Sequence, residues 1–493
     1  MKNKIFPNFE EAIADISDGA SIMMFHWSLG RSTPQNLIRA LYEKGTKDLT
    51  IISHNFIPAC LGEHFFDLTE VYTPLTLTNQ IKKVITASLG GTRYQKYGGA
   101  MLWERIAAGE VELELISHGT LAQRIRAGGA GLGGFYTPVG VGTIVEQGKE
   151  KKVIDGKEYV LEKPLKADFG FVRAYKADKR GNLVYRGSVR ACNPLIAMAC
   201  KVTIAEVDEI VEVGELDPEV IVTPGVFVNR IVKIPDGGCG SRSRMEFLFH
   251  KTLQALEETR EMKEGQDAQG MKDRLSEETI AMRVVKEFKD GDYVNLGVGI
   301  GLLCAQFTPP DKEIFYQAEQ GVVGYTRTLL KEESETADLD YVAVGRFLPP
   351  SSPGMSFFDI GTSFDMITGK HLDCTVLGGF EVSERGDLAN WTPGPVQMGI
   401  IGGSMDLAIG AKKVIIAMTH TTKEGKPKIV KECKLPLTAK KCVDLIVTDV
   451  AVIEVTLQGL MLKEIAPGWT AEEVQSMTEP KLMISDNLKE IAL

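Results

Sequence analysis

The chain alternates between helical and strand-like patterns of hydrophobic and polar residues from its first residues onward. FEEAIADI predicts a helix over residues 9–16, and DGASIMMF, residues 18–25, predicts a turn followed by a buried strand. PQNLIRALYEKG, residues 34–45, has the spacing of an amphipathic helix, with Pro near its start and Gly after its end. DLTIIS, residues 48–53, predicts another strand. Because helices that alternate with buried strands are typical of parallel sheets covered by helices, the pattern predicts an α/β fold.

The same order of elements begins again in the second half of the chain. Residues 276–301, SEETIAMRVVKEFKDGDYVNLGVGIG, predict a helix, an Asp-Gly turn and a buried strand, so that Asp290-Gly291 corresponds to Asp18-Gly19. Two similar halves are therefore predicted, each with a mainly parallel sheet covered by helices. The composition changes near residues 236–280, where a small polar stretch is followed by an almost wholly charged one. The predicted division is an N-terminal domain at 1–240, a charged linker at 241–275 and a C-terminal domain at 276–493.

One carboxylate has an unusual position in this pattern. The strand-like segment EIFYQA, residues 313–318, leads directly into Glu319 and a glycine, just as DLTIIS leads into His54 and Asn55. Ligands of open α/β sheets bind outside the carboxyl ends of the strands. If the halves pack about a pseudo-twofold axis, His54 and Asn55 are expected near Glu319. Glu319 is then either an ordinary acid at the end of a strand or a carboxylate held in a dry corner for chemistry.

Composition and charge narrow the class of protein. The 493 residues are 44% hydrophobic and 25% charged, as in soluble globular proteins of two or three domains. The net charge of −10, with no basic domain to offset it, argues against nucleic acid as the main partner. Neither a signal-like N-terminus nor a membrane-length apolar run is present, which predicts a cytoplasmic protein without a membrane partner. Eight scattered cysteines without a CxxC pair indicate reduced thiols.

Glycine-rich stretches and three histidines offer candidate chemistry. GAGLGG, residues 129–134, fits GxGxxG, but a helix-like segment precedes it where a dinucleotide site needs a strand. Two other glycine-rich stretches suit a close approach of the backbone to a ligand or an oxyanion. One follows a strand at residues 295–301, NLGVGIG, and the other leads into a helix at residues 399–410, GIIGGSMDLAIG. Tight turns are the alternative explanation of both. Three histidines follow strand-like runs at spacings that match no metal template, so no metal is predicted: His26, His54 and His118.

The blocks of sequence around these features closely resemble the family I CoA-transferases, of the succinyl-CoA:3-ketoacid type with both subunits fused. The resemblance covers nearly the whole chain, and its blocks keep the family's order. They are GTLAQRIRAGGAG (119–131), FYTPVGVGT (135–143), ADFGFVRAYKAD (167–178), YVNLGVGIG (293–301), PGMSFF (353–358), GDLANW (386–391), GGSMDLA (402–408) and PLTAKKCV (436–443).

The resemblance implies roles for particular residues. The family's Ser-Glu-Asn-Gly corresponds to Ala318-Glu319-Gln320-Gly321, which makes Glu319 the expected nucleophile. Such a carboxylate attacks the acyl-CoA thioester to give an acyl-glutamyl anhydride and then a glutamyl-CoA thioester, in ping-pong fashion and without a metal. CoA and acyl-CoA are expected as substrates, with no permanently bound cofactor, and the protein is expected to be a homodimer or homotetramer. Further expected site residues are Gly402 and Gly403 in the oxyanion loop, and Asn295, Gly297, Gly299 and Gly301 on the CoA side.

The chain departs from the family at several positions expected to border the acyl group. Phe25-His26-Trp27 stands for the family's Gly-Gly-Phe, His54-Asn55 for Asn-Asn, and His118 for Gln. After the nucleophile, Gly324-Tyr325-Thr326-Arg327 replaces Gly-x-Gly-Pro. These changes suggest the same chemistry on a different short-chain acid, with drift in a tolerant pocket as the alternative. The expected acyl-pocket residues are His26, His54, Asn55, His118, Gln320 and Tyr325, with Arg327 available to an anionic group.

Two rival functions use the same features. An acyl-CoA hydrolase on this scaffold would release CoA without an acceptor acid, because water would enter and cleave the glutamyl-CoA intermediate. A non-catalytic acyl-CoA binding protein would have lost activity through the altered loops. Retention of Glu319 and of the Gly-Gly loop speaks against the non-catalytic protein. The expected reaction is transfer of CoA between an acyl-CoA and a carboxylic acid, with succinyl-CoA and a 3-oxoacid or a related short-chain pair as substrates.

Overall fold

The structure, a computed structural model, describes most of the chain. The described residues are 3–26, 31–55, 79–89, 99–238, 240–244, 246, 273–329, 333, 336–343, 346–350, 352–396 and 399–492. The predicted linker at 241–275 lies mostly outside the described residues. The described sheets of the two halves span residues 21–233 and 293–490, and the proposed domain boundaries stay a prediction.

The first half is built on a parallel sheet. Its strand order is β11-β10-β8-β1-β2-β3-β4, and every neighbouring pair along this path is parallel. The strands are β1 (Ser21–Met24), β2 (Leu49–Ser53), β3 (Ile81–Thr86), β4 (Glu112–Leu115), β8 (Ala167–Asp178), β10 (Cys200–Val211) and β11 (Arg230–Lys233), with β9 (Leu183–Val184) added antiparallel to β8. The helices are α1 (Phe9–Ala12), α2 (Gln35–Lys44), α4 (Gly99–Ala107), α5 (His118–Ala130) and α6 (Asn193–Ala199). A small sheet joins β5 (Phe135–Thr137), β6 (Lys151–Ile154) and β7 (Lys157–Glu162).

The second half has a parallel centre with antiparallel pairs on both sides of it, and its edge strand β26 pairs parallel with β25. Its strand order is β17-β14-β13-β12-β18-β21-β23-β24-β25-β26, parallel from β13 through β23. The strands are β12 (Tyr293–Leu296), β13 (Phe315–Ala318), β14 (Val322–Tyr325), β17 (Ser356–Phe357), β18 (Cys374–Leu377), β21 (Val414–Met418), β23 (Leu445–Thr448), β24 (Ala451–Thr456), β25 (Gly459–Ile465) and β26 (Met483–Glu490). The helices are α8 (Glu277–Val285), α9 (Ile300–Leu303), α10 (Ile360–Thr368), α11 (Ser404–Gly410) and α12 (Ala471–Ser476). Short strands β15 (Val342–Ala343) and β16 (Arg346–Phe347) pair together, as do β19 (Glu381–Ser383), β20 (Leu388–Ala389) and β22 (Ile429–Val430).

The two sheets share the order that the repeated sequence pattern predicts. In the first half, β1 lies between β2 and β8; in the second, β12 lies between β13 and β18. The strand after Asp18-Gly19 thus corresponds to the strand after Asp290-Gly291. Helix α2 ends at Gly45, which has the left-handed φ of 72° expected of a C-terminal glycine. Helix α1 is shorter than predicted, because the chain leaves helical conformation at Ile13.

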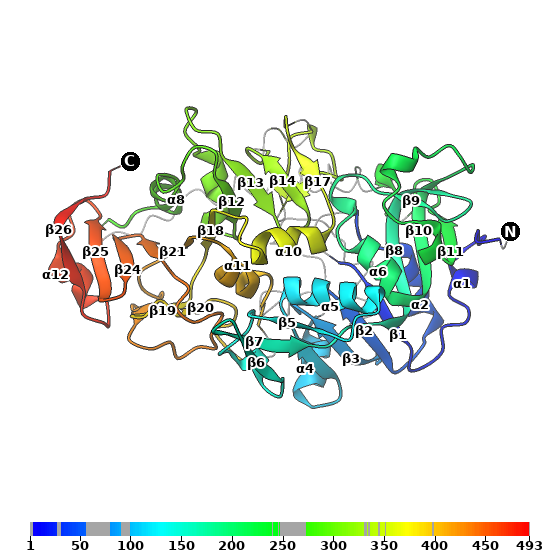
Figure 1. Ribbon diagram of the computed structural model, residues 1–493, viewed down its shortest axis with the longest axis horizontal. Helices are drawn as coiled ribbons and strands as arrows, with labels where there is room; N and C mark the ends of the chain where they lie inside the picture. The colour runs from blue at the N-terminus through cyan, green and yellow to red at the C-terminus, as the bar shows by residue number, and fades with distance from the viewer. Residues whose placement is uncertain are drawn as a thin grey trace, which may run out of the picture.

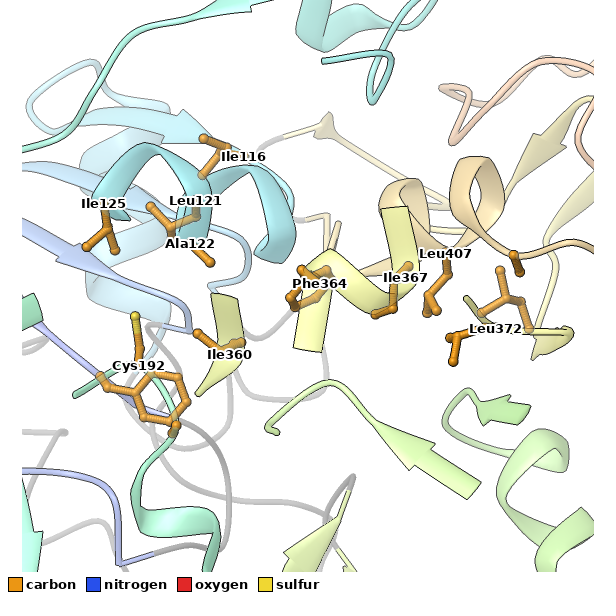
Figure 2. Packing of buried hydrophobic residues seen from close by; sticks show 14 of the residues in the cluster. Ile116, Leu121, Ala122, Ile125, Cys192, Ile360, Phe364, Ile367, Leu372 and Leu407 are labelled. Atoms are coloured by element: carbon orange, nitrogen blue, oxygen red, sulfur yellow. The ribbon is translucent and has the colours of Figure 1, made fainter. Parts of the chain in front are cut away.

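A shared apolar core joins the halves. Helices α5 and α6 of the first half pack together and α5 also packs against α10 of the second, while α11 packs against α10 and α5. Figure 1 shows α5, α10 and α11 between the two sheets. One continuous cluster of buried side chains includes residues from both halves, and Figure 2 shows part of it: Leu121, Ala122 and Ile125 of α5 with Ile360, Phe364, Ile367 and Leu407. The interface is therefore packed like a domain interior.

Candidate active site

Glu319 follows the last residue of β13, at the carboxyl end of a strand that pairs parallel with β12 and antiparallel with β14. The chain then turns back through Gly321 into β14. Gly321 has a φ of 108°, and a Cβ there would lie 2.1 Å from the carbonyl oxygen of Phe358. Only glycine fits this turn. The side chain of Glu319 is only 16% exposed, and burial raises the pKa of its carboxyl from 4.5 to about 7.

A buried polar network holds the strand that carries Glu319. The Asn295 amide on β12 donates to Oε1 of Gln317 on β13 at 2.7 Å. Gln317 in turn donates to the Ser363 hydroxyl of α10 at 2.7 Å, and that hydroxyl donates to the Ala318 carbonyl at 3.2 Å. Neither Gln317 nor Ser363 stands out in the sequence. Because buried polar groups are costly unless bonded, this network fixes the end of β13 against α10.

His118 connects Glu319 to the other half. It is the first residue of α5, where Ser117 caps the helix by accepting from the Thr120 N–H. Its Nδ1 lies 3.0 Å from Oε2 of Glu319, and its Nε2 lies 3.1 Å from Oδ1 of Asn55. Burial lowers the pKa of the imidazole to about 3, so the ring is neutral at neutral pH. The loop after β2 therefore lies beside the nucleophile's loop, as the repeat of the two halves predicted.

The other two histidines are also buried, and His54 lies beside His118. The ring of His54 lies 5.8 Å from that of His118 and 5.3 Å from that of Phe25, between centroids. Neither ring nitrogen of His54 has a hydrogen bond of good geometry within the described residues. Burial, and then the neighbouring His118, lower the pKa of His54 well below its ordinary value. Burial likewise lowers the pKa of His26 to about 3. All three imidazoles are therefore neutral.

The two glycines of the predicted oxyanion loop differ in what they contact. The Gly402 N–H donates to the Ala87 carbonyl at 3.3 Å, and the Gly402 carbonyl accepts from the His118 N–H at 2.8 Å, so Gly402 ties the halves together. The backbone of Gly403 lies directly against the nucleophile: a Cβ there would be 2.5 Å from the carboxyl carbon of Glu319. Gly403 is therefore the loop residue that touches the reacting group.

A second buried acid lies behind this loop. Asp406 of α11 is 1% exposed, and its Oδ2 accepts from the Gly119 N–H at 3.2 Å. Burial raises the pKa of Asp406 to about 7, opposed by hydrogen bonds from Gly119 and Ser117, and the charge of Glu319 raises it further. The residue belongs to the block GGSMDLA, but the sequence gives no separate reason to select it.

The glycines predicted on the CoA side have local structural reasons to be glycine. The Gly297 N–H donates to the Val376 carbonyl at 2.8 Å, and Cβ atoms on Gly297 and Gly301 would lie 2.9 and 3.0 Å from that oxygen. Gly299 has a φ of 91° with open space around it, and the neighbouring Val298 is 73% exposed. The loop thus presents an exposed tip, and its role in CoA binding stays a prediction.

The remaining predicted pocket residues follow Glu319 in the sequence. Tyr325 is fully buried, with its ring 5.8 Å from that of Tyr316 in the core of the second half, and Gln320 is 4% exposed. Arg327 forms an ion pair with Glu333, with N–O distances of 2.5 and 2.8 Å. That pairing engages the guanidinium proposed for an anionic acyl group.

Two further kinds of feature concern the described residues, a metal-binding group and a membrane-spanning helix. Among the described residues, no group of three His, Cys, Asp or Glu side chains is arranged to hold a metal ion. None of the described helices is long and apolar enough to cross a membrane. The six described cysteines are free thiols, while Cys60 and Cys239 lie outside the described residues.

Comparison with known proteins identifies the family. The sequence profile of the coenzyme A transferases matches residues 6–234 and 277–476. The mitochondrial succinyl-CoA:3-ketoacid coenzyme A transferase 2A of Mus musculus is 37% identical over 501 residues, which cover 97% of this chain and 89% of that protein. The alpha subunit of the acetate CoA-transferase of Escherichia coli is 41% identical over 47% of this chain and 97% of its own length. A crystal structure of an acyl-CoA transferase from E. coli O157:H7 in a thioester complex with CoA superposes with a TM-score of 0.75 at 20% identity, covering 100% of this chain and 95% of that one. The chain therefore belongs to family I of the CoA-transferases, as a single chain in which both halves are fused, and it transfers CoA between acyl-CoA thioesters and carboxylic acids.

Proposed function

We propose that Glu319 is the covalent nucleophile of this transferase. Its carboxylate attacks the carbonyl of the donor thioester, which forms an acyl-glutamyl anhydride and releases CoA as the thiolate. The thiolate then attacks the glutamyl carbonyl of the anhydride, so that the donor acid leaves as a carboxylate and glutamyl-CoA remains. An acceptor carboxylate reverses the two steps. No proton is consumed overall, and the net free-energy change is small because one thioester is exchanged for another.

The proposal rests on the position of Glu319 between the two halves of the chain. Its carboxyl is buried at a strand end, lies against Gly403 and is bound by His118 at 3.0 Å. Burial serves this chemistry because water would hydrolyse both the anhydride and the glutamyl-CoA. We assign the Gly403 N–H to the tetrahedral oxyanions, because its backbone is adjacent to the carbon that becomes tetrahedral. A well-placed oxyanion donor contributes roughly 3–4 kcal/mol to lowering the barrier.

The neutral state of the three predicted pocket histidines supports an acyl group that is polar but uncharged. His26, His54 and His118 are all held neutral by burial, so they do not neutralise a second carboxylate. His54, whose ring nitrogens make no hydrogen bond within the described residues, can exchange hydrogen bonds with a polar acyl group. Arg327 is already paired with Glu333. We therefore propose a short-chain acyl group with a neutral polar substituent, as in a 3-oxoacid, for at least one member of the substrate pair. Succinyl-CoA is the first partner to test, because the relatives named above include a succinyl-CoA:3-ketoacid transferase.

Peptide mass spectrometry tests the nucleophile directly. The protein is incubated with acetoacetyl-CoA, succinyl-CoA or acetyl-CoA and digested, and the peptide that contains Glu319 is examined for a CoA adduct. The adduct is expected in the wild type and in Glu313→Gln, which changes an exposed acid of the same segment, and is absent in Glu319→Gln. Full transfer activity of Glu319→Gln would overturn the assignment.

The same incubation separates transferase from hydrolase and ranks the acids. CoA release without added acceptor acid would favour hydrolysis, whereas release that depends on acceptor favours transfer. If the neutral imidazoles select the acyl group, kcat/KM for acetoacetyl-CoA exceeds that for succinyl-CoA. A preference for dicarboxylic acyl groups would contradict this specificity. Val298→Asp is expected to raise KM for every acyl-CoA if the glycine loop binds CoA.

The assembly is a further proposal. We propose a homodimer or homotetramer, because the chain resembles the family. The cytoplasmic location stays a prediction. Light scattering coupled to size exclusion measures the assembly. A mass equal to one chain of 54.0 kDa would contradict it.

A further inference from the structure

A chain of two hydrogen bonds links the halves through His118, and its protons can be counted. A neutral imidazole has one N–H and one lone pair, and an amide oxygen only accepts. With Oδ1 of Asn55 at 3.1 Å from Nε2, the N–H of His118 lies on Nε2. The lone pair on Nδ1 then faces Oε2 of Glu319 at 3.0 Å, and that contact is a hydrogen bond only when Glu319 carries the proton. As placed, the three groups describe the carboxylic acid form of the nucleophile.

We propose that Asn55, acting through the tautomer of His118, sets whether Glu319 is a carboxylic acid or a nucleophilic carboxylate. The inference rests on the proposed role of Glu319. In the reactive state, the carboxyl proton has moved from Oε2 to Nδ1 and the Nε2 proton has gone to solvent. Nδ1–H then donates to the carboxylate. Oδ1 of Asn55, which only accepts, then faces the bare lone pair on Nε2, so the amide opposes this state. One proton leaves the group, and the ring stays neutral throughout.

The surroundings favour a change of tautomer over a charged ring. The groups that face His118 include Glu319 after β13, Asn55 and the ring and backbone of His54 after β2, and the apolar Phe364 of α10, whose ring centroid lies 6.4 Å away. Asp406 of α11 binds the next backbone N–H at Gly119. Burial that holds the pKa of His118 at about 3 disfavours an imidazolium here. An imidazole can still partner both forms of the carboxyl at the same atom.

Asn55 is the positioning residue in this arrangement. By accepting from Nε2–H it keeps the Nδ1 lone pair turned toward Glu319, and so stabilises the acid form. Without the Asn55 amide, Nδ1–H is free to donate to the carboxylate. We expect Asn55→Ala to lower the apparent pKa of Glu319 by about one, so that a site half ionised at pH 7 becomes half ionised near pH 6. The reactive fraction at pH 6 would then rise about fivefold.

Nitrogen NMR of histidine-labelled protein tests the tautomer without any reaction. The chain has seven histidines, and His118→Gln assigns the signals of His118. Both ring nitrogens of His118 are expected to shift with a midpoint near pH 7 while the ring stays neutral, with Nε2–H below the midpoint and Nδ1–H above it. The midpoint disappears in Glu319→Gln and moves to lower pH in Asn55→Ala. A fixed tautomer from pH 5.5 to 8.5, or two protonated nitrogens below the midpoint, overturns the proposal.

A kinetic arm uses the rate of CoA-adduct formation on Glu319 across the same pH range. Asn55→Ala is expected to shift the acid limb to lower pH by about one pH unit. In the His118→Gln background, where no tautomer exists, the same Asn55→Ala change should produce no shift. Asn229→Ala serves as the matched control, because it removes an asparagine amide elsewhere in the chain, one that accepts from the Thr203 N–H. An Asn55→Ala shift that persists without His118 refutes the relay. If no adduct forms at all, the nucleophile assignment fails, and the NMR result still decides the relay.

Discussion

Replacing Gly403 by alanine places one methyl group against the nucleophile. A Cβ at this position would lie 2.5 Å from the carboxyl carbon and Oε2 of Glu319 and 2.6 Å from Oε1. The φ of −94° and ψ of 3° at Gly403 match the third residue of a type I turn, a conformation that alanine adopts, so backbone strain contributes little. Because ordinary carbon contacts are about 3.5 Å, the carboxyl has to retreat by about 1 Å. Nearly the whole effect of the substitution should therefore reach the protein through Glu319.

The size of that effect follows from two general magnitudes. A misplacement of about 1 Å of a reacting group can lower a rate by about 100-fold. Crowding of one extra methyl group into a packed site costs about 1–3 kcal/mol of unfolding free energy. We therefore expect Gly403→Ala to slow CoA-adduct formation by about 100-fold, and to destabilise the fold by an amount that denaturant unfolding can resolve.

The assay compares three proteins. Gly133→Ala is the matched control, because a Cβ at Gly133 meets nothing within 4 Å and its φ is not positive. Its adduct rate and stability should stay close to those of the wild type. In a Glu319→Ala background the methyl group meets no carboxyl, so the stability cost of Gly403→Ala should disappear. Wild-type adduct rates in Gly403→Ala would refute the close packing of these two residues, as would a stability cost that persists without Glu319.

Three further changes test other parts of the structure. Folding raises the pKa of Glu319 from 4.5 to about 7, so the folded state holds the proton more tightly and the stability of the wild type falls as the pH rises from 4.5 to 7. Glu319→Gln should therefore be more stable than the wild type at pH 8, by up to roughly 3 kcal/mol of unfolding free energy. Urea titrations should show this difference vanish near pH 4.5. In the wild type, the Arg283 guanidinium donates to the buried Glu464 carboxylate at 2.6 and 3.0 Å. Arg283→Met removes this partner and should lower the free energy of unfolding by about 3–5 kcal/mol. A second change, Glu464→Leu, should restore most of that loss. Gly321→Ala should prevent stable folding of the turn or abolish adduct formation, because a Cβ there would lie 2.1 Å from a backbone oxygen at a φ of 108°; normal thermal stability together with normal activity would contradict it.

Sequence patterns predicted the architecture because they act locally. Alternating helices and strands, the repeated Asp-Gly turns and the strand ending at Glu319 are all properties of short segments, and the two sheets confirm them. The repeat also predicted that Asn55 and Glu319 lie on neighbouring loops. In a parallel sheet the carboxyl ends of the strands share one edge, and the loops that bind ligands lie at that edge.

The contacts within the site could not be predicted in the same way. His118 lies 201 residues from Glu319 in sequence, and Gly119 lies 287 residues from Asp406. Such pairs arise from how α5 and α11 pack, which no periodicity within either helix specifies. His118 was expected to border the acyl group, whereas the structure bonds it directly to the carboxyl. The glycines at 297 and 301 were ambiguous for a similar reason, since the Val376 carbonyl that crowds them lies on another strand.

The apolar core that passes through both halves has a consequence for chains that are cut in two. Leu121 and Ile125 on one side and Phe364 and Ile367 on the other belong to one cluster, so separation of the halves would expose a large hydrophobic face on each. The fused chain keeps these faces at a high effective concentration, so their association does not depend on the amount of protein present. If the chain is divided between the halves and the two pieces are produced together, they should reassemble with the Glu319 carboxyl against Gly403. The specific activity of the two pieces should then fall steeply on dilution, whereas that of the single chain should not.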